Sequence, residues 1–277
     1  MSQNTDGGKK LLAFTALVSS ILLAVIRTAI IINNMEKTSV DENAYYLPAT
    51  DGVIAFDVMA FVLCAAMVVI SFFIGRKRIC TVDLKSSASA STSLIYAFTL
   101  VFLFAVYVYF IASQRHEYTG MECAVSALAL LSALYFLLSG VIACRKADCS
   151  AEKLALPALL PVFYCAIRLL NDFLKKNSAP MESSGAYHIL SLAAVMLFFF
   201  VEGRSLIKPT PLSVYLICGV SSLVLLIIYA LPDLIVHGFG LLEFDYYTFA
   251  SIADLCVAGY ICSRMITCKA LTKPDRA

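Results

Sequence analysis

Charged residues are scarce in this chain: they make up 14% of its 277 residues, whereas hydrophobic residues make up 61%. Soluble globular domains carry about a quarter charged residues and about half apolar ones. The core of a water-soluble domain cannot bury so many apolar residues, so the composition excludes an ordinary soluble domain. The next question is whether the apolar residues come in runs long enough to cross a bilayer.

Metal-binding signatures are also missing. The chain has three histidines, and none of its ten cysteines forms a C-x-x-C pair. Structural zinc sites depend on such closely spaced ligands, so we predict no metal site. Most of the cysteines lie within apolar runs, where they serve as small packing residues.

Enzymatic motifs are absent as well. The sequence contains no G-x-S-x-G, H-E-x-x-H, Walker or G-x-G-x-x-G pattern, and these motifs carry much of the recognisable nucleophilic, metal and nucleotide chemistry. We therefore assign no catalytic residue and no cofactor, and an enzyme is the less favoured class. Basic residues do not form a stripe with aromatic residues, so we expect no nucleic-acid partner.

The apolar residues fall into eight nearly uncharged runs. Most contain about 20 residues, enough to cross a hydrocarbon layer of roughly 30 Å as a helix. We therefore predict an all-α integral membrane protein with eight transmembrane helices and short connectors, the longest at 33–51. The predicted spans are 11–32, 52–75, 93–113, 121–144, 154–174, 186–207, 212–236 and 241–262.

Basic residues alternate between the two sides of the predicted spans. Both terminal tails, 1–10 and 264–277, and the even-numbered loops carry 15 of the 21 Lys and Arg residues. Four lie on the other side, and Arg27 and Arg168 fall inside spans. Cytoplasmic loops are enriched in Lys and Arg, so this pattern predicts that both termini are cytoplasmic. The short tails and loops favour a multi-pass protein of a bacterial plasma membrane.

Two halves of the chain share a faint internal similarity. A shift of 119 residues superposes Tyr96 on Tyr215 and Arg145 on Arg264. This pattern predicts two four-helix pseudo-repeats, residues 11–150 and 151–263. Because each half has an even number of spans, the two copies would have parallel orientation.

Ionisable groups inside spans are the main candidates for a functional site, because they usually face protein or water. Arg27 and Asp57 lie at similar depths in the first two spans, where an ion pair is geometrically open. In the fifth span, Arg168 and Asp172 are four residues apart and share a helix face. We predict an outward-facing polar vestibule that binds a small anionic solute, lined by Arg27, Asp57, Arg168, Asn171, Asp172 and His188.

A plainer interpretation of the same residues stays open. Each lies within two turns of an interface, so Arg27 can extend its guanidinium to the headgroups. Asp57 is then stabilised by the positive end of its helix, and Arg168 with Asp172 forms a structural pair.

Asp254 lies deeper in its predicted span. Small residues at four-residue spacing flank it, including Ala250 and Ala258, and they allow another helix to approach closely. A similar stripe in the fourth span predicts Ser132, Ser139 or Tyr135 as its hydroxyl partner. Asp254 is either a proton-coupling carboxyl or a permanently protonated packing residue.

Several local features carry weaker expectations. Glu202 lies one turn from the end of its span and is predicted to be interfacial. Pro157 and Pro161 predict a kink in the fifth span, and Pro232 is predicted to end the seventh. The Ser/Ala-rich stretch 86–93 is predicted to be a flexible linker.

Two functions remain open at this point. The favoured one is a small-solute carrier or solute-binding membrane module, with lipid and a small anionic solute as its partners. The alternative is a non-enzymatic membrane assembly or sensory component without transport activity. The sequence neither requires nor excludes a homo-oligomer or a protein partner.

Overall fold

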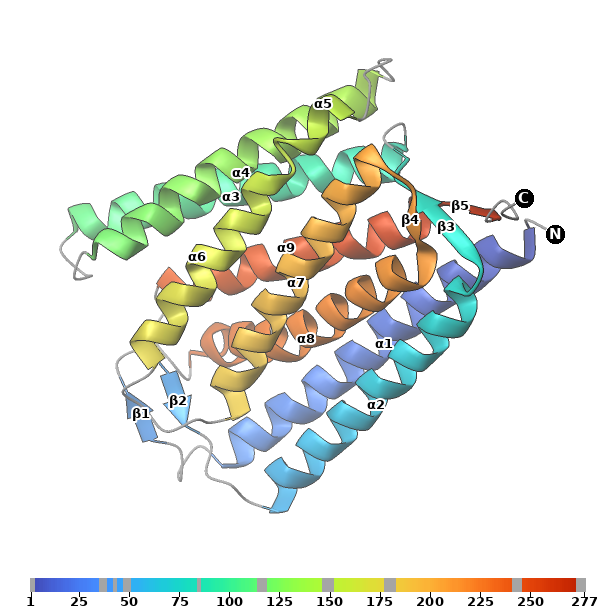
Figure 1. Ribbon diagram of the computed structural model, residues 1–277. Helices are drawn as coiled ribbons and strands as arrows, with labels where there is room; N and C mark the ends of the chain where they lie inside the picture. The colour runs from blue at the N-terminus through green and yellow to red at the C-terminus, as the bar shows by residue number, and fades with distance from the viewer. Residues whose placement is uncertain are drawn as a thin grey trace.

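The structure is a computed structural model that describes residues 3–34, 39–41, 44–46, 51–83, 86–113, 119–145, 152–176, 183–240 and 246–272. Long helices dominate these residues (Figure 1). The helices are α1 (Gln3–Asn33), α2 (Asp51–Gly75), α3 (Ser87–Ala112), α4 (Gly120–Arg145), α5 (Glu152–Ala155), α6 (Leu159–Lys176), α7 (Ser183–Ile207), α8 (Leu212–Gly238) and α9 (Tyr246–Thr267). The strands are β1 (Ser39–Asp41), β2 (Ala44–Tyr46), β3 (Arg78–Thr81), β4 (Thr210–Pro211) and β5 (Lys269–Thr272).

Eight helical segments within these described ranges are long and apolar enough to cross a membrane. They match the eight predicted spans in number and order, with α5 and α6 together forming the fifth. The break between α5 and α6 contains Pro157, whose ring cannot continue the backbone ladder. Pro161 lies in the first turn of α6, where a missing N–H leaves no helical bond unmade. The predicted kink is therefore present.

Three predicted boundaries are wrong. The stretch 86–93 is not a flexible linker, since α3 begins at Ser87 and hydroxyls in its first turns bond back to the backbone. The last span does not end at 262, because α9 runs to Thr267. Pro232 does not end its span either, because α8 continues to Gly238.

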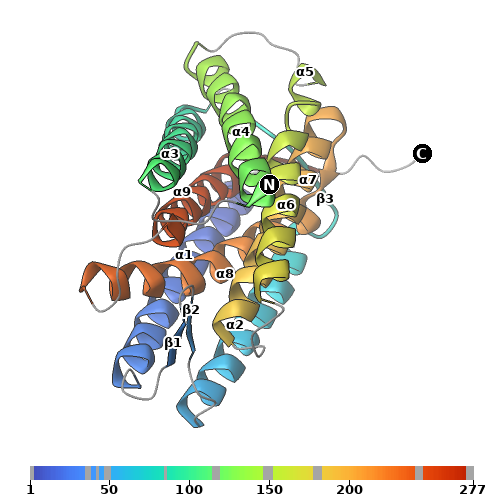
Figure 2. The same cartoon turned by 90° about the vertical axis from the view of Figure 1, so that its left-hand side faces the viewer.

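The eight spans do not share their exposure to lipid equally. In α7 and α8, 61% of the most apolar stretch is buried inside the protein, against 22% in α2. Helix α8 occupies the centre, packed against α1, α2, α7 and α9 (Figures 1 and 2). Helices α2, α3 and α4 turn large apolar side chains outward, such as Phe61 and Phe98. Such an outer surface suits acyl chains rather than water.

The helices of the two predicted halves interleave. The α1–α2 pair packs on α8, the α3 helix packs on α9, and α4 packs on α6. In Figure 1 α8 and α9 lie between the α1–α2 pair and the α3–α4 pair. The pseudo-repeat stays a prediction.

Two small antiparallel sheets lie at opposite ends of the bundle (Figure 1). Strands β1 and β2 pair within the connector that follows α1. At the other end β3 pairs with both β4 and β5. The start of α1 lies at this second end, where the Lys9 ammonium donates to the carbonyl of Cys268. The beginning of α1 and the last described strand therefore share one face, as an even number of spans requires.

Candidate functional site

A layer of buried polar groups crosses the bundle in the half nearer the β1–β2 hairpin. It includes all the predicted vestibule residues and Asp254, contributed by α1, α2, α6, α7 and α9. At 1.5 Å per residue, these positions lie about 6 to 12 Å from the nearer ends of their helices. The structure thus brings the vestibule residues together with Asp254, which the sequence placed deeper because the predicted span began at 241 and α9 begins at Tyr246.

The centre of this layer is a two-pronged ion pair between α6 and α9. The Nη1 of Arg168 donates to Oδ1 of Asp254 at 2.6 Å, and its Nη2 donates to Oδ2 at 2.7 Å. Both side chains are less than a tenth exposed. A buried bidentate pair of this kind has short, directional hydrogen bonds. Removal of one partner destabilises the protein, because it leaves the other charge buried without a counter-charge.

These contacts correct two expectations. Arg168 does not pair with Asp172 one turn away but reaches across to α9 instead. Asp254 does not depend on a hydroxyl of α4, and Ser139 contacts Arg264. Packing explains the difference, because α9 lies against α3 and α8 while α4 lies against α3 and α6.

His188 of α7 links the ion pair to a second carboxylate. Its Nε2 lies 3.3 Å from Nη2 of Arg168 and 3.5 Å from Oδ2 of Asp172. Because a guanidinium only donates hydrogen bonds, Nε2 accepts this one, which assigns the neutral imidazole a proton on Nδ1. The amide of Asn171 donates to the other oxygen of Asp172 at 3.3 Å. If Nε2 bound a proton, it could no longer accept a hydrogen bond from Arg168 and could donate one to Asp172 instead.

Arg27 meets the layer from α1 through a backbone carbonyl of α8. Its Nη1 donates to the carbonyl oxygen of Ile228 at 3.0 Å. That oxygen lacks its usual helical donor because the residue four positions later is Pro232, which has no N–H. Arg27 thus satisfies the carbonyl that Pro232 frees, which explains how α8 continues beyond its proline.

Asp57 is connected to Arg27 through a tyrosine. The hydroxyl of Tyr187 donates to Oδ1 of Asp57 at 2.9 Å, and the guanidinium carbon of Arg27 lies 4.6 Å from the centre of the same ring. Cation–π contacts at this distance are favourable. The sequence allowed a direct ion pair between Arg27 and Asp57. In the structure Tyr187 lies between them and contacts both.

Aromatic and polar residues of α7 and α8 complete the layer, and sequence reasoning missed them. Tyr229 stacks on the imidazole of His188, with ring centres 4.3 Å apart. Asp233 accepts a hydrogen bond from Ser251 at 2.6 Å. The signal that could have found them is Pro232, since a proline inside an apolar span frees a carbonyl that needs a nearby donor.

A second buried ion pair lies near the opposite end of the bundle. The Nε of Arg264 lies 2.7 Å from Oε1 of Glu202, and both side chains are 1% exposed. Tyr260 donates its hydroxyl hydrogen to the same oxygen at 2.9 Å. Glu202 is therefore buried against α9, a partner of which the sequence gives no sign, and its interfacial depth stays a prediction.

Beyond this pair, Lys9 and two cysteines close the end that carries the three-stranded sheet. Cys80 and Cys268 are both buried. A hydrogen bond with the Cys268 thiol, reinforced by burial, raises the pKa of the Cys80 thiol. The ammonium of Lys9 lies 4.0 Å from Sγ of Cys268. This group ties α1 and β3 to the end of α9.

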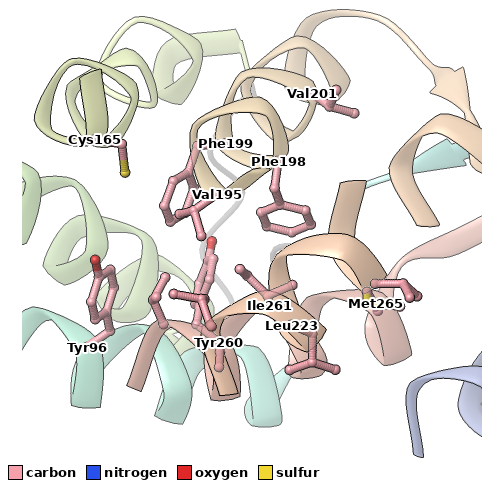
Figure 3. Close-up of a cluster of buried hydrophobic side chains, with 14 of the residues drawn as sticks. Tyr96, Cys165, Val195, Phe198, Phe199, Val201, Leu223, Tyr260, Ile261 and Met265 are labelled. Atoms are coloured by element: carbon pink, nitrogen blue, oxygen red, sulfur yellow. The ribbon is translucent and has the colours of Figure 1, made fainter. Parts of the chain in front are cut away.

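An apolar and aromatic layer separates the two ion pairs. Figure 3 shows Tyr96 and Tyr260 within it, together with Phe198, Phe199 and Val195. The ring centres of Tyr96 and Tyr260 lie 6.4 Å apart. In Figure 3 the hydroxyl of Tyr96 points from α3 towards α6. Charge is therefore concentrated in two separate layers of the bundle.

Neither layer resembles a metal centre. Among the residues that the structure describes, no three His, Cys, Asp or Glu side chains lie close enough to hold an ion together. The chemistry available is acid–base exchange and recognition of anions by arginine.

Comparisons of the chain with protein-family models, with curated proteins and with solved structures find no match. The function must therefore be inferred from the site itself.

Proposed function

We propose that this chain is a membrane carrier that moves a small anionic solute together with a proton. The observation that supports the proposal best is the two-pronged contact between Arg168 and Asp254 inside the bundle. Buried ionisable groups within membrane spans commonly mark solute pathways and proton relays.

The geometry of this contact suggests the class of solute. The Arg168 guanidinium faces two carboxylate oxygens held side by side. A solute carboxylate or phosphate presents the same pair of acceptors. Such an anion can take the place of Asp254 on Arg168 without leaving a buried cation unpaired.

Protonation of Asp254 allows the solute anion to replace it on Arg168. Protonated Asp254 no longer offers a full negative charge, and Arg168 becomes available to an incoming anion. His188 Nε2 lies 3.3 Å from Nη2 of the same guanidinium, and Asp172 lies next to His188. The proton and the anion would therefore load as a neutral pair, which lowers the cost of crossing a low-dielectric interior.

Arg27 offers a second cationic group in the same layer. It is 3% exposed, and its Nη2 has no hydrogen-bond partner among the described residues. A buried donor without a partner is costly, and an anion in this layer would satisfy it. Arg27 contacts Tyr187, and Arg168 contacts His188, the next residue of α7.

We also propose that the carrier lies in a bacterial plasma membrane with both termini in the cytoplasm. The distribution of Lys and Arg supports this orientation. The vestibule layer would then open towards the outside.

The test is uptake by proteoliposomes under an imposed pH gradient. The probes are radiolabelled acetate, lactate, succinate and inorganic phosphate. One pH unit drives about tenfold accumulation of a monoanion that moves with one proton. Asp254→Asn should slow gradient-driven uptake to the rate of protein-free liposomes, which acetate and lactate cross as neutral acids without a carrier. Arg168→Lys should weaken uptake because it removes the fork. The exposed Asp51→Asn is the matched control and should behave as wild type.

Unchanged accumulation in Asp254→Asn would remove Asp254 from the mechanism. A wild-type protein that moves none of the four probes faster than protein-free liposomes would contradict the proposal. It would then favour a membrane assembly or sensory component in which the ion pair is structural.

A further inference from the structure

Glu202 holds a buried carboxylate whose two oxygens have unequal surroundings. Oε1 accepts from Tyr260 and lies 2.7 Å from Arg264. Oε2 is buried and has no hydrogen-bond partner among the described residues. Buried acceptors are rarely left in this state, and each exception calls for a physical explanation.

The hydroxyl of Tyr215 does not supply the missing donor. This hydroxyl on α8 is fully buried and, like Oε2, has no hydrogen-bond partner within the described part of the chain, so the two atoms do not bond to each other. An ionised Oε2 therefore keeps its charge in a buried position without a donor. A proton bound at Oε2 removes that uncompensated charge.

Arg264 would keep hydrogen-bond acceptors if Glu202 were neutral. Its Nε donates to the Tyr260 oxygen at 2.9 Å. Its other nitrogens donate to the carbonyl of Asp83 at 3.3 Å and to Oγ of Ser139 at 3.4 Å. Since these neutral acceptors stay in place, the cluster can hold Glu202 in either charge state.

From these observations we propose that Glu202 is a second proton-binding carboxyl of the carrier, acting at the end opposite Asp254. The inference rests on the proposed function and extends it to the other end of the proton route. A proton leaving Asp254 restores the Arg168–Asp254 pair. The same proton, once bound at Glu202 Oε2, departs to water at the end that carries the three-stranded sheet.

Both the surroundings and the position of Glu202 suit this role. The titratable and charged groups around it come from four elements: Tyr135 of α4, Tyr215 of α8, Tyr260 and Arg264 of α9, and Cys80 of β3. Asp83 leads to the surface, because its carboxylate pairs with exposed Lys269 at 3.3 Å. Towards Asp254, the tyrosines Tyr260 and Tyr96 lie between the two carboxyls.

The test measures protonation directly in liposomes, with the proton as the only ligand. Infrared difference spectra between alkaline and acidic buffer record the C=O band of protonated carboxyl groups. In Glu202→Gln a component of this band from a buried group should disappear. The exposed Glu152→Gln is the matched control and should retain it. Retention of the whole buried band in Glu202→Gln would overturn the inference.

A milder variant guards against misfolding of Glu202→Gln. Glu202→Asp keeps a carboxyl at this position but shortens the side chain, so the buried component should persist at a shifted frequency. A component identical to that of wild type would show that it arises from another group and would overturn the inference.

The inference and the proposed function can fail separately. In liposomes filled with a pH-sensitive dye, adding the four probes should drive proton entry in wild type faster than in protein-free liposomes, and Glu202→Gln should reduce this excess to near zero. Full proton entry in Glu202→Gln but none in Asp254→Asn would refute the role of Glu202 and leave the carrier intact. A Glu202-dependent band without any probe uptake would support the proton site and refute the carrier.

Discussion

The contact between Arg27 and the carbonyl freed by Pro232 can be tested by a double-mutant cycle. Arg27→Met removes the donor to Ile228. Pro232→Ala supplies a backbone N–H that can take its place. If the structure is right, the loss caused by Arg27→Met should be smaller when residue 232 is alanine, because the carbonyl then keeps a partner.

The expected magnitudes follow from the contacts. A buried carbonyl left without a donor costs about 1 to 3 kcal/mol, and loss of the cation–π contact with Tyr187 adds about 0.5 to 1 kcal/mol. Removing the unpartnered Nη2 of Arg27 offsets part of this cost. Polar interactions between membrane helices average about 0.6 kcal/mol with a maximum near 1.7. We therefore expect Arg27→Met to destabilise by roughly 1 to 2 kcal/mol, with a coupling of about 1 kcal/mol to Pro232.

The assay is reversible unfolding in mixed micelles, with the four proteins compared under identical lipid and detergent conditions. The cycle cancels the effect of Pro232→Ala on the unfolded chain, which a single mutant would not. A coupling energy within about 0.3 kcal/mol of zero would refute the contact.

Three further predictions concern the end of the bundle that carries the three-stranded sheet. Hydrogen bonding with Cys268 and burial raise the pKa of the Cys80 thiol. Maleimide should therefore label exposed Cys144 and not Cys80 in the folded protein. The stability that Cys80 contributes is present below the ordinary thiol pKa and is lost as the pH rises towards the raised value. Gly75→Ala should disrupt folding, because a Cβ there would lie 2.2 Å from the backbone of the first turn of α8, whereas Gly259→Ala meets nothing within 4 Å and should be tolerated in a detergent thermal-stability assay. Tags on the two termini should be accessible from the same face of sealed vesicles, and labelling from opposite faces would contradict the even number of spans.

Much of the fold follows from the sequence because a bilayer imposes a simple rule. An apolar run of about 20 residues must be helical, since every backbone group needs an internal partner. The errors lie at the ends, where Ser87 and Arg264 were assigned to connectors by their polarity. Each is accommodated by a partner, the local backbone for the serines and Glu202 for Arg264, and such partners are invisible before the helices are packed.

The candidate site shows the same division. Depth could be counted from the sequence, and it placed Arg27, Asp57 and Arg168 in one layer. Partners could not be counted, because they depend on which helices are neighbours. Arg168 pairs with Asp254, 86 residues away, rather than with Asp172 on its own helix face. An i,i+4 relation makes a contact available, but a better-placed carboxylate on another helix takes it.

Competition between Asp254 and a solute anion for Arg168 is the central claim, and equilibrium binding of the four anionic probes to purified protein tests it most directly. Asp254→Asn should bind the same anion more tightly than wild type, because no carboxylate then occupies Arg168, although it cannot couple uptake to a proton gradient. Weaker or unchanged binding in Asp254→Asn would contradict the account.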